Sequence, residues 1–318
     1  MENLKKNKDK LEYDDEIDFH ELFRIVWAKK LMIFVLTSFF ACLSILYSLS
    51  LPNIYKSESL LASKNSKNDI SAMIGQYAGL ASLAGVSTPV NNDNKTQEAV
   101  TRIQSFDFFI KYFLPQISLE NLMAVKQWNA KENIILYDEN IYNADLGKWL
   151  REVNFPRTAQ PSLQEAYAEY KKIMQIEVDL TTSFVTLSII HQSPFIAKKW
   201  NEIIINEINK SMRELDKQEA TKSLDFLTNL APQVNYGEIR DVLSSLQQEQ
   251  MKSLMLIEAN EDYVFKLIDS PISSETKFKP KRSVIVIFAT FFGFLLSLIL
   301  SIAVHYLKLS YKNKHNSS

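Results

Sequence analysis

Cysteine and glycine are scarce in this chain, and each scarcity excludes a class of site. The 318 residues include one cysteine, Cys42, and six glycines. A lone cysteine forms neither an intrachain disulfide nor a cysteine-rich metal site. Gly75, Gly79 and Gly85 lie close together, but their spacing fits neither a dinucleotide-binding loop nor a phosphate-binding loop. We therefore expect neither a disulfide-stapled domain nor a nucleotide site.

The sequence also lacks a charge excess and a catalytic motif. Lys and Arg number 36 against 37 Asp and Glu, so there is no basic field of the kind that binds nucleic acid. None of the four histidines stands at zinc-ligand spacing from another histidine or a carboxylate, and no G-x-S-x-G elbow occurs. The sequence therefore predicts a non-enzyme with no catalytic residues, no cofactor and no metal site.

Two long apolar segments dominate what is present. Leu31–Leu51 and Ser283–Leu307 contain no Asp, Glu, Lys or Arg. A helix of ~20 apolar residues crosses the ~30 Å hydrocarbon core of a bilayer. The first segment is not typical of a cleaved signal, because its apolar core is long and no small-residue cleavage site follows Leu51. The sequence predicts two transmembrane helices that hold one large domain between them.

Basic residues beside these segments predict their orientation. Those outside the pair favour cytoplasmic termini: Arg24, Lys29 and Lys30 before the first, and Lys308, Lys312 and Lys314 after the second. Four basic residues just before the second segment oppose this orientation: Lys277, Lys279, Lys281 and Arg282. The first helix usually dominates, and long loops translocate largely regardless of charge. We expect a cytoplasmic segment at 1–30, transmembrane helices at 31–51 and 283–307, a domain outside the cytoplasm at 52–282 and a cytoplasmic tail at 308–318.

The domain between the two segments carries both strand and helix patterns. Apolar residues alternate in Ile176–Leu180 and Phe184–Ile190, which predicts a hairpin, and Ile54–Ala62 is a further strand candidate. Ser193 as N-cap and Pro194 in the first turn open a long helical region at about 194–257. Residues 115–160 show no clear period. The predicted fold class is α+β: a mixed base, a long extended helix and two membrane anchors.

Leucines form a stripe on the long helical region, on both sides of a break at Pro232 and Gly237. The stripe consists of Leu224, Leu227, Leu230, Leu243 and Leu246. Because Glu207–Lys222 is too charged for a buried helix, we expect the helix to leave the globular body and pack in a coiled coil against helices of neighbouring subunits. A two-helix hairpin within one monomer is the alternative.

The second apolar segment carries a stripe of small residues. Ala289, Gly293, Ser297 and Ser301 are four residues apart. Such a face supports close packing of transmembrane helices. Its partner is left open among the first apolar segment (with Ser38, Ala41 and Ser48 roughly on one face), a sister subunit and another protein. A separate run of small residues, Ser71–Val86, is a candidate loop for partner contacts.

Several stretches, in this order, carry a resemblance to a known family. They are DEIDFHELFRIVWAKK from residue 15, IYKSESLLA from residue 54, GLASLAG from residue 79, IEVDLTTSFVTLSIIHQSPFIAKKWNEII from residue 176 and YVFKLIDSPISSETKFKPKR from residue 263. Together they make the chain resemble, over nearly its whole length, the Wzz-type chain-length determinants, or polysaccharide co-polymerases, of Gram-negative inner membranes. One departure is a segment before the second span with few prolines, Pro271 and Pro280.

The resemblance implies a periplasmic α+β domain, a long helix extending away from the membrane and a ring-like homo-oligomer. It implies a non-enzymatic role in setting the modal length of a surface polysaccharide, such as the O antigen of lipopolysaccharide, alongside the membrane polymerase. A lipid-linked glycan is a further candidate partner. The family's kinase relatives carry a cytoplasmic domain that is not expected in the tail at 308–318. Two other functions stay open: a periplasmic adaptor of a polysaccharide exporter and a membrane sensor, which the lack of an output domain disfavours.

Overall fold

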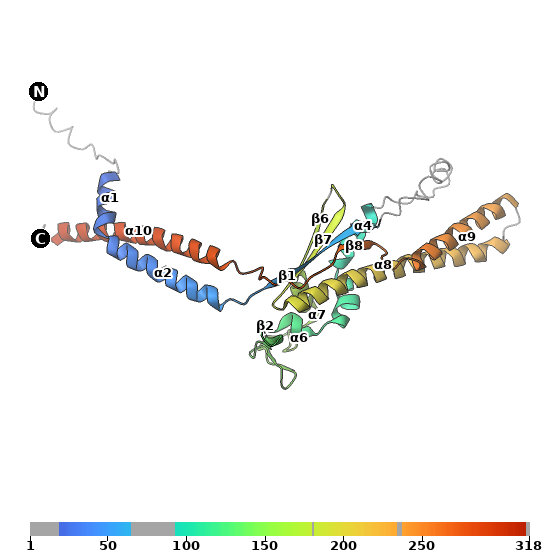
Figure 1. Ribbon diagram of the computed structural model, residues 1–318, viewed down its shortest axis with the longest axis horizontal. Coiled ribbons are helices and arrows are strands. Elements are labelled where there is room, and N and C mark those ends of the chain that lie inside the picture. Colours follow the sequence, from blue (N-terminus) through green and yellow to red (C-terminus); the bar gives the residue numbers. More distant parts are fainter. Residues whose placement is uncertain (1–18, 65–92, 180, 234–236, 316–318) are drawn as a thin grey trace, which may run out of the picture. The chain divides into compact units, whose positions relative to one another are not determined.

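The computed structural model describes residues 19–64, 93–179, 181–233 and 237–315 (Figure 1). The chain divides into two compact units. We call residues 1–51 and 280–318 the apolar-helix unit, and residues 52–279 the sheet unit. The predicted mixture of helices and strands is confirmed. The candidate contact loop Ser71–Val86 lies outside the described residues.

The apolar-helix unit consists of α1 (Phe19–Ala28), α2 (Lys30–Ser50) and α10 (Arg282–His315). The most apolar 18-residue windows of Lys30–Ser50 and Arg282–Leu307 have mean hydropathies of 2.1 and 2.6, and both helices are long enough to cross a bilayer. Only 17% of the most apolar window of each is buried. The two helices match the predicted membrane segments in length and composition. Their exposure differs from that of a core helix in a soluble protein, which buries its apolar side chains.

The sheet unit is built on an antiparallel sheet with the strand order β6-β7-β1-β8. These strands are β6 (Met174–Val178), β7 (Phe184–His191), β1 (Tyr55–Ser63) and β8 (Phe265–Asp269). The hairpin β6–β7 lies where the two-residue alternation predicts it, and β1 lies within the strand candidate Ile54–Ala62 and one residue beyond it. Tyr55 pairs with His191, so β1 enters the sheet beside the end of β7.

A long helix, α8 (Pro194–Leu230), covers one face of the sheet with its first half. It begins at the predicted Pro194, although the Ser193 side chain makes no capping hydrogen bond. Apolar side chains every three to four residues face the sheet: Ala197, Trp200, Ile204, Ile208 and Met212. They pack with Leu187 and Ile189 of β7 in one core cluster.

Shorter helices complete this core. They are α4 (Asp93–Ile103), α5 (Phe106–Phe108), a π-helical turn at Phe109–Phe113, a 3₁₀ turn at Leu114–Gln116, α6 (Leu119–Met123) and α7 (Leu163–Ile173). Tyr170 of α7 is fully buried against Phe109 and Phe113, and its hydroxyl donates to the Ile103 carbonyl. The stretch without a clear sequence period forms two small hairpins, β2 (Val125–Asn129) with β3 (Ile134–Tyr137) and β4 (Tyr142–Asn143) with β5 (Lys148–Trp149).

The predicted long helical region is two helices. After Leu230, a short 3₁₀ turn at Ala231–Gln233 ends α8, and α9 (Gly237–Glu258) packs back along it. Figure 1 shows α8 and α9 side by side as a hairpin that leaves the sheet. At 1.5 Å per residue, α8 is about 55 Å long.

Candidate functional site

Within the described residues, no group of three His, Cys, Asp or Glu is placed to hold a metal ion. The candidate features are helical surfaces and the side chains that position them. Four are described below: the N-terminal half of α8 on the sheet, the hairpin α8–α9, the polar contacts of the loop before α7, and the contact between α2 and α10.

Two buried asparagines tie α8 to the sheet. The Asn201 amide donates to the carbonyls of Ser57 (3.1 Å) and Leu187 (3.0 Å), and its Oδ1 accepts from Ser59 (2.8 Å). Ser57 and Ser59 belong to β1 and Leu187 to β7, so one side chain bonds both central strands. Buried polar groups need such partners, which makes the position of α8 on the sheet specific.

Asn209, two turns further along α8, joins the helix to strand β8 and to the residue before that strand. Its Oδ1 accepts from the backbone N–H groups of Val264 (2.8 Å) and Phe265 (2.9 Å), and its amide donates to the Phe265 carbonyl (3.0 Å). Neither asparagine is among the residues that the sequence patterns predict. Their signal was present, because each interrupts the apolar face of α8 with a polar residue.

The leucine stripe lies largely in the seam between α8 and α9 of one chain. Leu243 is buried and Leu224, Leu227 and Leu230 are half-buried, whereas Leu246 is exposed. A hydrogen bond from Gln247 to Thr228 (3.3 Å) and an ion pair between Lys217 and Glu258 set the register of the two helices. The structure thus forms the intramolecular hairpin, the alternative to packing between subunits, and the role of these leucines in an oligomer stays a prediction.

The hairpin keeps a second set of apolar side chains on its outside. Its exposed large apolar residues are Phe226, Ile239, Val242, Leu246, Met251, Met255 and Leu256. In the described chain each of these side chains is at least 38% exposed, in contrast to the buried and half-buried leucines of the seam. Apolar surface of this kind on a helix pair is typical of an interaction face.

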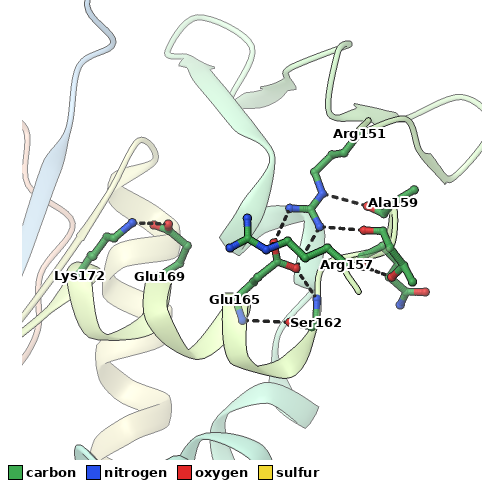
Figure 2. A network of polar contacts seen from close by, with 9 residues as sticks. Arg151, Arg157, Ala159, Ser162, Glu165, Glu169 and Lys172 are labelled. Carbon is green, nitrogen blue, oxygen red and sulfur yellow. Dashed lines mark hydrogen bonds and ion pairs between the residues drawn. The ribbon is translucent and has the colours of Figure 1, made fainter. Parts of the chain in front are cut away.

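A clamp of polar contacts fixes the loop that precedes α7 (Figure 2). Arg151 binds Glu165 through two parallel hydrogen bonds (3.1 and 3.2 Å) and also donates to the carbonyls of Thr158 and Ala159. Ser162 and Glu165 cap α7 reciprocally in a capping box, with the spacing Ser-x-x-Glu that is typical of this motif. The Arg151 guanidinium, followed by the Ser162 N–H, lowers the pKa of the Glu165 carboxyl to about 2.

His191, at the end of β7, is buried beside the start of α8. Its Nδ1 accepts from the Ser193 N–H (2.9 Å), so its Nε2 carries the proton and donates to the Asn121 carbonyl (2.9 Å). Burial lowers the pKa of His191 to about 4, which keeps the ring neutral near pH 7. Its two bonds join α6 to the N-terminus of α8, which is a positioning role.

The small-residue stripe of α10 faces α2 in the same chain. Gly293, Ser297 and Ser301 are buried and Ala289 is half-buried. A Cβ atom on Gly293 would lie 2.6 Å from the Phe40 Cβ, so only glycine permits this approach of the helices. Ser297 Oγ lies 3.4 Å from Thr37 Oγ1. On α2, Ser44 and Ser48 are buried whereas Ser38 and Ala41 are half-buried.

Arg282, at the start of α10, was not singled out for this contact. Its guanidinium donates to the carbonyls of Ser48 (3.1 Å) and Leu51 (3.5 Å) at the end of α2. Carbonyls at a helix C-terminus have no intrahelical partners and carry partial negative charge. Arg282 therefore joins the end of α2 to the beginning of α10.

One family model matches part of this chain. Residues 15–113 match the family model described as Wzz, chain length determinant protein. No curated protein matches the sequence. A solved full-length bacterial polysaccharide co-polymerase is similar at 13% identity, over 92% of this chain and 98% of that one, with a TM-score of 0.41. A fragment of WzzB, a polysaccharide co-polymerase from Salmonella Typhimurium, has 14% identity over 71% of this chain and 100% of that one, with a TM-score of 0.31. Such low TM-scores carry no argument about this fold.

Proposed function

From the Wzz-type chain length determinant region that this chain carries at residues 15–113, we propose that it is a non-enzymatic regulator of the modal length of a surface polysaccharide. The O antigen of lipopolysaccharide, or a similar glycan, is the polymer that we propose. The chain acts as a homo-oligomer together with the membrane polymerase that builds the glycan.

The observation that carries this proposal is the family match, which runs from α1 to the π-helical turn at Phe109–Phe113. The two apolar helices support a place in the inner membrane, because both are long enough to span it and expose apolar side chains. Basic residues outside the pair support cytoplasmic termini and a periplasmic sheet unit.

In this mechanism the hairpin α8–α9 sets the geometry of the assembly. Its root is held by Asn201 and Asn209, and its exposed apolar residues, such as Val242 and Leu246, supply the surface on which a second subunit packs. A rigid hairpin of fixed register transmits subunit spacing over its length. A change in subunit spacing then changes the length at which the polymerase stops extending one glycan.

The test of the proposed function is a gel ladder of surface polysaccharide from cells with the gene deleted and then restored. A regulator predicts that deletion replaces a cluster of band lengths with a smooth decay, and that restoration brings the cluster back. If total polymer disappears from the surface while lipid-linked polymer accumulates inside, the chain is instead an exporter adaptor. An unchanged ladder contradicts both functions.

Subunit packing through the outer face of the hairpin can be tested separately, because the apolar residues of the seam are less exposed than those of the outer face. Leu224→Asp with Leu243→Asp breaks the intrachain seam, whereas Val242→Asp with Leu246→Asp charges only the outer face. If the outer pair leaves both oligomer size and glycan length unchanged, packing through this face is wrong.

A further inference from the structure

A run of basic residues lies just before α10. Lys277 and Lys279 lie on the side of the membrane where the proposed orientation disfavours lysine. Both side chains are exposed. Among the described residues, no Asp or Glu lies within ion-pair distance of either of them, so local charge pairing does not explain their placement.

These lysines lie where the chain both enters and leaves the sheet unit. Ile54 pairs with Lys279 in an isolated bridge: the Ile54 N–H donates to the Lys279 carbonyl (2.9 Å) and the Phe278 N–H donates to the Ile54 carbonyl (2.8 Å). Ile54 is three residues from Leu51, where α2 ends. Three extended residues span at most about 11 Å, so covalent connection keeps this bridge close to the end of α2.

Two aromatic residues, Tyr55 and Phe278, are the chain neighbours of the two residues of this bridge. Tyr55 lies edge-on to Trp128 (5.4 Å between centroids), and Trp128 is edge-on to Phe195 (5.9 Å), whose side chain is about half exposed. The ammonium groups of Lys56 and Lys279 lie 4.7 and 5.1 Å from the Phe278 ring centroid. Aromatic rings next to lysines are the side chains that proteins place at the headgroup layer of a bilayer.

We propose that this end of the sheet unit, formed by Lys277 and Lys279 with Tyr55, Trp128, Phe195 and Phe278, is a surface that binds the anionic phospholipid headgroups of the membrane. The inference rests on the proposed membrane anchoring. Lysines beside a bilayer attract anionic headgroups by about 1 kcal/mol each, and the short connections hold these two within the reach of that field. The aromatic rings supply the apolar contact that a water-exposed loop would not need. The surface thereby fixes the sheet unit against the bilayer.

The experiment uses the full-length protein reconstituted in bilayers with trace spin-labelled phosphatidylglycerol or phosphatidylcholine. The measured quantity is the ratio of the association constants of the two labelled lipids with the protein. Lys277→Gln with Lys279→Gln should lower this ratio by about twofold or more. The matched control, Lys222→Gln with Lys252→Gln, makes the same charge change at exposed positions of the hairpin and should leave the ratio unchanged. The difference should disappear at about 1 M salt, where the Debye length is about 3 Å.

Equal ratios in the two double variants would overturn the proposal. So would a result in which binding of an added polyprenyl diphosphate falls while the phosphatidylglycerol ratio stays constant, because the lysines would then serve a carrier lipid. An alkaline carbonate wash separates this inference from the proposed function. Protein released by the wash contradicts membrane anchoring itself, whereas retained protein with an unchanged ratio contradicts only the headgroup surface.

Discussion

At the scale of single residues, His191 makes the stability of the sheet unit depend on pH. Its folded pKa of about 4 lies below the unfolded value of 6.5, so the unfolded chain binds the proton more strongly. The stability from the neutral ring is complete above pH 6.5 and is lost as the pH falls towards 4. Over this window the linkage amounts to about 3 kcal/mol.

Urea unfolding of the full chain in mild detergent, at pH 7.5, 5.5 and 4.5, checks this prediction. We expect the midpoint of the wild-type protein to fall with pH, and His191→Gln to show a smaller fall from a lower starting value. Glu165 contributes little to this pH dependence. Its folded pKa of about 2 lies below its usual value of 4.5, so the stability that it contributes is lost only as the pH falls below about 4.5. Equal pH slopes in both proteins would contradict the assignment to His191.

Asn209 carries the second prediction at this scale. Asn209→Leu removes the acceptor for two backbone N–H groups, at Val264 and Phe265, and leaves them buried without partners. We expect a loss of about 2–4 kcal/mol in the free energy of unfolding. Asn206→Leu is the matched control, because Asn206 is exposed on the same helix and should change stability by less than about 0.5 kcal/mol. Similar losses in the two variants would show that the buried bonds are not the cause.

At the scale of elements, the close contact of α2 and α10 rests on Gly293. Gly293→Leu places a side chain into Phe40 and must push the helices apart. In a Cys42→Ser background, Thr37→Cys and Ser297→Cys should form an oxidative cross-link, since the native hydroxyl oxygens are 3.4 Å apart. We expect Gly293→Leu to suppress that cross-link and Ala303→Leu, at an exposed position of α10, to leave it intact. A cross-link that survives Gly293→Leu contradicts the contact.

The hairpin gives a second prediction for an element. Leu243→Asp buries a carboxylate in the seam between α8 and α9, at a cost of about 3 kcal/mol or more. Hydrogen exchange should therefore accelerate throughout α9 while the sheet keeps its protection. Leu246→Asp, at an exposed position one turn away, should leave exchange in α9 nearly unchanged. Faster exchange in both variants alike would contradict the seam.

Sequence reasoning predicts the elements whose pattern is local. The alternation in Phe184–Ile190 and the Pro194 start of α8 are recovered, because burial on one face fixes the period. The sequence does not decide whether α8 packs against α9 of its own chain or against a helix of another subunit, because the same leucine stripe would serve either contact. Residues 115–160 gave no period because their strands are only two to five residues long. Asn201 and Asn209 stand out in the sequence as polar residues on the apolar face of α8. Their partners are carbonyls and N–H groups distant in sequence, and no local pattern identifies those partners.

At the scale of the whole molecule, the chain consists of the apolar-helix unit, with α1, α2 and α10, and the sheet unit. Its division into cytoplasmic, membrane and periplasmic parts remains a prediction. The proposed function needs both units: one places the chain beside a membrane polymerase, and the other projects the hairpin whose exposed apolar residues supply a subunit contact. The buried and clustered polar side chains described above, such as Asn201, Asn209 and Arg151, position helices and loops. This role suits a scaffold protein that acts through the arrangement of its subunits.

The measurement that tests this account most directly is the length distribution of surface polysaccharide in deleted cells that express the wild-type chain or a hairpin variant at equal levels. Val242→Asp with Leu246→Asp should shift or broaden the cluster of lengths while total polymer stays constant. Lys222→Gln with Lys252→Gln, on the same hairpin, should reproduce the wild-type cluster. A wild-type cluster in both variants would contradict the claim that the outer face of the hairpin sets glycan length.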